Sequence, residues 1–117
     1  MKEFAVTQSL GLLTYQRNLI FPAVVDADQE FLKRLEANYA FTFDVDALPE
    51  PFPAPSLFLT GRFDYWCGYQ GAYRILDNYP RATFAVLDGA GHALTYEQNS
   101  LFKALVSEWL DRVEEYA

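Results

Sequence analysis

The sequence predicts an α/β fold in which a helical N-terminal part precedes a unit ordered strand, helix, strand, helix. Two short apolar runs, residues 56–60 and 82–87, are rich in aromatic and branched side chains. A segment with helical spacing separates them, and a longer amphipathic segment follows. A connection of this length through a helix suits parallel strands, so we expect one parallel pair.

Composition restricts the classes of function. The chain has 117 residues, of which 51% are hydrophobic, so it is long enough for one compact domain with a modest core. Its net charge of -7 repels phosphate groups and anionic lipids, which argues against nucleic-acid and membrane partners. The sequence shows neither a signal peptide nor a long apolar run, and we expect a cytoplasmic location.

The N-terminal part, residues 1–48, is predicted to be helical. A weak apolar pattern favours a helix over about residues 10–19, ended by Pro22. The spacing of a capping box over residues 26–29 predicts the start of a second helix. Its expected apolar face contains Phe31, Leu32, Leu35 and Tyr39.

A proline-rich connector, residues 49–55, divides this part from residues 56–117. Proline lacks a backbone donor, so the connector is expected to be extended and outside any sheet interior. The apolar run that follows it predicts a strand buried on both faces.

A helix is then expected over about residues 68–78, before the second strand and a glycine-rich turn at residues 88–91. Its inward side chains are predicted to be Tyr73, Ile75 and Leu76. The terminal helix, from about residue 97, is expected to present a stripe of Leu101, Leu105, Val106, Trp109, Leu110 and Val113. Its acidic residues, Glu108, Asp111, Glu114 and Glu115, are expected to form a solvated face with Arg112 among them.

Two side chains follow the carboxyl ends of the predicted strands, where the ligands of parallel sheets gather. Asp64 lies shortly after the first strand, and His92, the single histidine, lies shortly after the second. A carboxylate beside an imidazole is the supporting half of a nucleophile–base–acid triad. The alternative is structural: Asp64 caps the following helix and His92 is an ordinary turn residue.

Residues 55–115 resemble the C-terminal end of an α/β-hydrolase. The resemblance is carried by Gly61-Arg62-Phe63-Asp64, by Asp88-Gly89-Ala90-Gly91-His92, by Glu97 and by Glu108-Trp109-Leu110. It implies that Asp64 is the triad acid and His92 the catalytic histidine. Residues 1–48 are similar, more loosely, to the end of the cap that such enzymes insert before the penultimate strand.

The nucleophile elbow of that family, Gly-x-Ser-x-Gly, and its oxyanion loop do not occur in the sequence. Ser9 and Cys67 are the alternative nucleophiles, but Ser9 also fits the start of a helix, and a lone cysteine is most often a small buried hydrophobe. The aromatic residues Phe63, Tyr65 and Trp66 are candidates for a pocket lining, with core packing or a partner surface as the alternative. Cys67 alone forms no internal disulfide, and the sequence shows no cysteine and histidine cluster, so no metal or cofactor is expected.

Two functions follow as hypotheses. The first is a protein of the serine-hydrolase lineage that keeps the acid and histidine and lacks the nucleophile-bearing half, so that it is inactive alone and needs a complementing N-terminal hydrolase chain. The second is a non-catalytic module, derived from a truncated hydrolase, that binds or self-associates. Under either hypothesis the predicted strand pair has an exposed sheet edge, so a homodimer is expected.

Overall fold

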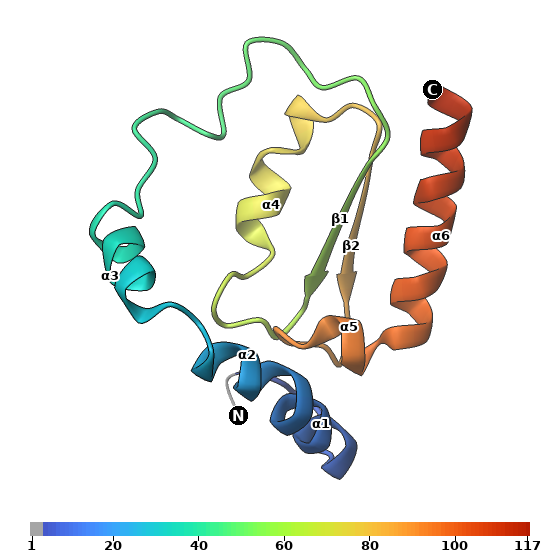
Figure 1. Ribbon diagram of the computed structural model, residues 1–117. Helices are drawn as coiled ribbons and strands as arrows, with labels where there is room; N and C mark the ends of the chain where they lie inside the picture. Colours follow the sequence, from blue (N-terminus) through green and yellow to red (C-terminus); the bar gives the residue numbers. More distant parts are fainter. Residues whose placement is uncertain (1–3) are drawn as a thin grey trace. The chain divides into compact units, whose positions relative to one another are not determined.

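The computed structural model describes residues 4–117, which form two compact units. One unit contains residues 9–47, and the other contains residues 48–117 together with the N-terminal segment as far as Gln8. Figure 1 shows helices alone in the first unit, and a two-stranded sheet with its helices in the second.

The helical unit begins with three consecutive helical segments, α1 (Leu10–Tyr15), the π-helix η1 (Gln16–Ile20) and α2 (Phe21–Val25). The prediction that Pro22 ends the first helix is wrong, because the backbone remains helical through Val25. Proline removes an intrahelical hydrogen bond and crowds the preceding turn, and a local π-helical stretch accommodates both effects. Pro22 stands in the first turn of α2, where its missing N–H matters least.

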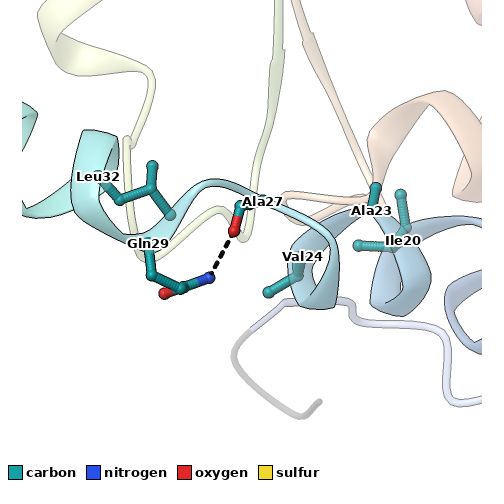
Figure 2. Close-up of a pocket in the computed structure, with 6 residues that line it drawn as sticks. All are labelled: Ile20, Ala23, Val24, Ala27, Gln29 and Leu32. Atoms are coloured by element: carbon teal, nitrogen blue, oxygen red, sulfur yellow. Dashed lines mark hydrogen bonds between the residues drawn. The ribbon is translucent and has the colours of Figure 1, made fainter.

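The second helix of this unit, α3 (Gln29–Ala37), is capped by Asp28, whose side chain accepts from the N–H groups of Glu30 and Phe31. Tyr39, predicted on its apolar face, lies beyond its end and is exposed. The other three predicted apolar residues are also exposed. A pocket of about 380 Å³ is lined by residues of η1, α2, α3 and the loop before α3, and Figure 2 shows its lining: Ile20, Ala23, Val24, Ala27, Gln29 and Leu32.

The sheet unit contains two parallel strands, β1 (Ser56–Gly61) and β2 (Ala82–Leu87), as the sequence predicts. Their register pairs Ser56 with Ala82 and Gly61 with Leu87, so the strands end side by side at their carboxyl ends. The prediction that β1 is buried on both faces is wrong, because its first five residues are only half-buried. In the described chain this sheet has two strands, so each strand has one neighbour rather than two.

The connection between the strands contains α4 (Gln70–Arg74) and the 3-10 helix η2 (Leu76–Asn78), which together occupy the predicted helical segment. Ile75 and Leu76 are half-buried, but the prediction that Tyr73 points inward is wrong, since that side chain is 65% exposed. Its ring still contacts that of Phe84, with centroids 5.9 Å apart.

After β2 the chain forms the short helix α5 (Leu94–Glu97) and the terminal helix α6 (Asn99–Tyr116). Two members of the predicted α6 stripe, Leu101 and Leu110, are exposed, whereas the other four are half-buried. Trp109 donates its Nε1–H to the carbonyl of Pro55 at 2.9 Å, which joins α6 to the start of β1. Among residues 4–117, no helix is both long and apolar enough to cross a bilayer.

The acidic face of α6 is exposed as predicted, but Arg112 does not share that solvent exposure. Its guanidinium donates to Glu108 at 2.7 Å and, through Nη2, to the Thr83 hydroxyl at 2.8 Å. Arg112 therefore ties α6 to β2.

Candidate active site

The acid of the site is held by a turn that follows β1. Asp64 Oδ1 accepts backbone N–H bonds from Trp66 at 3.0 Å and from Cys67 at 3.1 Å. A short side chain that accepts from residues two and three positions ahead stabilises its own turn. The alternative interpretation, that Asp64 caps the following helix, is wrong, because α4 begins at Gln70 and its N-cap residue is Tyr69. These two backbone bonds occupy Oδ1 and leave Oδ2 for another partner.

The histidine lies beyond the glycine-rich turn that follows β2. Gly89 adopts a positive φ of 62°, a conformation that favours glycine. The next two residues, Ala90 and Gly91, are buried, and His92 follows them with an exposed side chain. The N–H of Ala93 donates to the carbonyl of Phe4 at 3.1 Å, so the N-terminal segment is bonded to the residue that follows His92.

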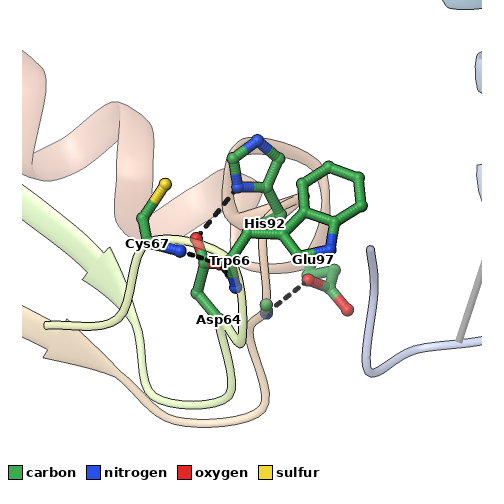
Figure 3. Close-up of polar contacts among 6 residues, drawn as sticks. Asp64, Trp66, Cys67, His92 and Glu97 are labelled. Atoms are coloured by element: carbon green, nitrogen blue, oxygen red, sulfur yellow. Dashed lines mark hydrogen bonds and ion pairs between the residues drawn. The ribbon is translucent and has the colours of Figure 1, made fainter. Parts of the chain in front are cut away.

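The two side chains meet, although 28 positions separate them. Asp64 Oδ2 lies 3.0 Å from His92 Nδ1. A dashed line marks this contact in Figure 3. An ionised carboxylate only accepts hydrogen bonds, so Nδ1 carries the proton and donates it. Within residues 4–117, Nε2 has no hydrogen-bond partner. The lone pair of Nε2 is thus available as a base.

The pKa of the Asp64 carboxyl results from opposing effects. Partial burial raises it, because desolvation disfavours the charged form. The hydrogen bonds from Cys67, His92 and Trp66, together with the charge of His92, lower it, and the net result is a pKa below 3.8. The acid is therefore ionised at neutral pH. Its side chain is 9% exposed, against 36% for His92, so the carboxylate is covered and the imidazole faces outward.

Two aromatic rings contact the imidazole. The Trp66 ring centroid lies 4.7 Å from that of His92, and the Phe4 centroid lies 5.6 Å from it. The Phe4 and Trp66 rings also meet edge to face, at 5.8 Å. Such contacts restrict the orientation of the imidazole.

A second carboxylate, Glu97, holds the histidine loop in place. Its Oε1 accepts from the backbone N–H of Thr7 at 2.7 Å, and its Oε2 accepts from that of Gly91 at 2.7 Å. The sequence predicts no role for Glu97, although this residue belongs to the pattern that carries the family resemblance. Phe4 was also missed, and no sequence signal places it beside His92, because the contact is made across the fold.

A close backbone approach brings the two loops together. A Cβ added to Gly61 would lie 2.4 Å from the carbonyl oxygen of Gly91 and 2.6 Å from that of Ala90. Such distances are well inside van der Waals contact, so only glycine fits at the end of β1. The Phe63 N–H donates to the Ala90 carbonyl at 2.9 Å across the same gap.

The two alternative nucleophiles have different surroundings. Ser9 caps α1, accepting from the Leu12 N–H at 3.1 Å, so it is a helix-start serine as one of the two interpretations expected. Cys67 is a free, exposed thiol, so the expectation of a small buried hydrophobe is wrong. The turn at Asp64, whose carboxylate accepts from the Cys67 N–H, holds Cys67 at the surface.

Two of the three candidate pocket residues line a cavity. Tyr65 and Trp66 line a cavity of about 370 Å³ beside Asp64 and Cys67, whereas Phe63 is not among its lining residues. Tyr65 is 75% exposed and Trp66 is 57% exposed, so neither belongs to the core.

Asp64, Cys67 and His92 form a group with three kinds of metal-ligating atom. One ligand atom from each lies within 4.8 Å of the others. Because the thiol and the carboxylate come from one loop and the imidazole from another, no local sequence pattern reveals the cluster.

The chain was compared with known proteins. No family model matches it, and neither a curated protein nor a solved structure matches it.

Proposed function

We propose that the chain belongs to the α/β-hydrolase lineage and provides the acid and the base of a serine-hydrolase site, with Asp64 as the acid and His92 as the base. The observation that carries the proposal is the 3.0 Å hydrogen bond from His92 Nδ1–H to Asp64 Oδ2, with Nε2 unoccupied in the described chain. This is the arrangement a triad requires, because the carboxylate selects the tautomer whose other nitrogen accepts a proton.

In the proposed reaction, Nε2 of His92 takes the proton of a serine hydroxyl as that oxygen attacks an ester carbonyl. Asp64 stabilises the imidazolium that forms and remains ionised. His92 then returns the proton to the leaving group. A complementing hydrolase chain supplies the hydroxyl and the oxyanion donors in this proposal, so the chain alone is inactive.

Complementation tests the proposal. The chain would be co-expressed with a polypeptide that carries the strands, the oxyanion loop and the Gly-x-Ser-x-Gly elbow of an α/β-hydrolase, and p-nitrophenyl acetate hydrolysis would be measured. We expect serine-dependent turnover that falls by about 10⁴-fold in His92→Gln. The control, Asp77→Asn, removes an exposed acid of η2 and should retain full turnover.

Two results would contradict the proposal. One is turnover in the assembled protein that His92→Gln leaves unchanged. The other is hydrolysis by the isolated chain that disappears in Ser9→Ala or Cys67→Ala, since the nucleophile would then lie in this chain.

The second candidate function is a non-catalytic module that associates with itself. It is favoured by one observation: the described sheet has only two strands, and the first five residues of each are half-buried. If sedimentation shows dimers and complementation gives no turnover, this second function is the better description.

A further inference from the structure

The group formed by Asp64, Cys67 and His92 offers one oxygen, one sulfur and one nitrogen ligand to a common point. These atoms lie within 4.8 Å of one another, and two of the three side chains are exposed. We propose that these three residues bind a zinc ion, which replaces the hydrogen bond between Asp64 and His92.

The distances suit a tetrahedral ion. Zinc bonds to nitrogen and oxygen are about 2.0–2.1 Å long, so two such ligands on one tetrahedral ion lie about 3.3 Å apart. Asp64 Oδ2 and His92 Nδ1 are 3.0 Å apart, so a small shift admits the ion between them. The third ligand, the Cys67 sulfur, lies within 4.8 Å of the other two ligand atoms, so it needs to approach by at most about 1.3 Å to complete a bond of about 2.3 Å. Cys67 is exposed, so rotation of its side chain accomplishes this.

The kinds of ligand favour zinc over other common divalent ions. Magnesium and calcium prefer oxygen ligands alone, whereas zinc accepts carboxylate, imidazole and thiolate together. Three protein ligands leave a fourth position for water, as in catalytic rather than structural zinc sites. The net charge of -7 also attracts cations.

The surroundings already orient one ligand and provide access. Asp64 Oδ1 accepts from the N–H groups of Trp66 and Cys67, which fixes the carboxylate while Oδ2 faces the histidine. The cavity of about 370 Å³ borders both Asp64 and Cys67, so an ion reaches the cluster from solvent.

Binding changes the protonation of two ligands. The Cys67 thiol releases its proton to solvent, and the neutral imidazole moves its proton from Nδ1 to Nε2. The lone pair of Nε2 is then no longer available as a base. Zinc at this site and proton transfer by His92 are therefore mutually exclusive, and zinc binding itself does not depend on whether His92 activates a nucleophile.

Cobalt provides the direct test with the isolated chain, without any assay of hydrolysis. Co²⁺ would be titrated into the full chain and displaced by Zn²⁺. We expect an intense visible spectrum typical of tetrahedral cobalt and a near-ultraviolet thiolate-to-cobalt band that Cys67→Ser abolishes. Zinc affinity, from competition with a chromophoric chelator, should fall at least about 10-fold in His92→Gln and in Asp64→Asn. Asp77→Asn, which lies outside the cluster, should bind as tightly as the wild type.

Circular dichroism of each variant would establish that it is folded. The absence of the thiolate-to-cobalt band from the wild type, or its persistence in Cys67→Ser, would overturn the proposal. The ¹⁵N spectrum of the single histidine provides a second measurement. Zinc on Nε2, with Nδ1 still protonated, would overturn the replacement of the hydrogen bond.

Discussion

The carboxylate of Glu97 accepts a 2.7 Å hydrogen bond from the backbone N–H of Gly91, the residue before His92. Its other oxygen accepts from the N–H of Thr7, 90 positions before Glu97, so one side chain joins the N-terminal segment to the histidine loop. This half-buried carboxylate therefore fixes the backbone directly before His92, although through these bonds it touches neither Asp64 nor His92.

Glu97→Gln is expected to destabilise the sheet unit and to disturb His92. An amide has one acceptor oxygen, so one backbone N–H would face the NH₂ group instead of an oxygen. We expect the free energy of unfolding, from urea titration, to fall by about 1–3 kcal/mol. The ¹⁵N resonances of the His92 ring should shift as well.

The matched control for this substitution is Glu115→Gln, which alters an exposed acid of α6. It should change stability by less than about 0.5 kcal/mol. Equal stability of the two variants would show that Glu97 does not support the loop.

Gly61→Ala should destabilise the chain because its Cβ would meet two backbone carbonyl oxygens, which cannot rotate away. A loss of about 1–3 kcal/mol or more is expected, measured by thermal unfolding. Gly71→Ala is the matched control: nothing lies within 4 Å of the added Cβ, and the position is inside α4. That variant should be more stable by about 0.5–1 kcal/mol, since alanine favours helix. A Gly61→Ala protein as stable as Gly71→Ala would exclude the close approach.

Asp64→Asn should change the tautomer of His92. The carboxylate selects the neutral form with its proton on Nδ1, whereas an amide that donates to Nδ1 selects the opposite form. Because the chain has one histidine, a long-range ¹H–¹⁵N spectrum recorded with a metal chelator reports this ring alone. We expect protonated Nδ1 in the wild type and in Asp77→Asn, and protonated Nε2 in Asp64→Asn. The same tautomer in all three proteins would contradict the assigned hydrogen bond.

The lowered pKa of Asp64 predicts how its contribution to stability depends on pH. Because the folded-state pKa lies below 3.8, the ionised form is favoured in the folded state. The contribution is present above that unfolded value and is lost as the pH falls through the folded value. The stability difference between wild type and Asp64→Asn should therefore be larger at about pH 5 than at about pH 2.5, by urea unfolding with chelator present. A difference that grows toward acid pH would reverse the sign of the pKa shift.

Self-association is expected from the sheet, since each strand of the described pair has one edge without a strand partner. Exposed aromatic side chains, including Phe41 at 70% and Phe43 at 67%, add apolar surface. Sedimentation velocity at micromolar concentration should show a dimer. A stable, folded monomer at this concentration would contradict the prediction.

The sequence alone determined the order strand, helix, strand, helix in the sheet unit, both strands to within one residue, and the parallel pairing, but it did not predict the short helix α5. The position of each strand depends on the composition of its own segment. The parallel pairing depends on the length of the connection between the strands, which can also be read from the sequence. The sequence also placed Asp64 and His92 beyond the strand ends, at one edge of the sheet. It was wrong for Pro22 and Tyr73, because a π-helical turn and the packing around α4 override local preference.

Only the tertiary structure decided what these side chains contact. The bond between Asp64 and His92 joins residues 28 positions apart, and the Glu97 bond to Thr7 spans 90. The exposure of Cys67 and its place in a three-ligand cluster follow from the turn that Asp64 organises and from the loop that carries His92. Such contacts arise when separate segments pack together. The residue pattern of one segment cannot predict such a contact, because the contact also depends on where the partner segment lies in the fold.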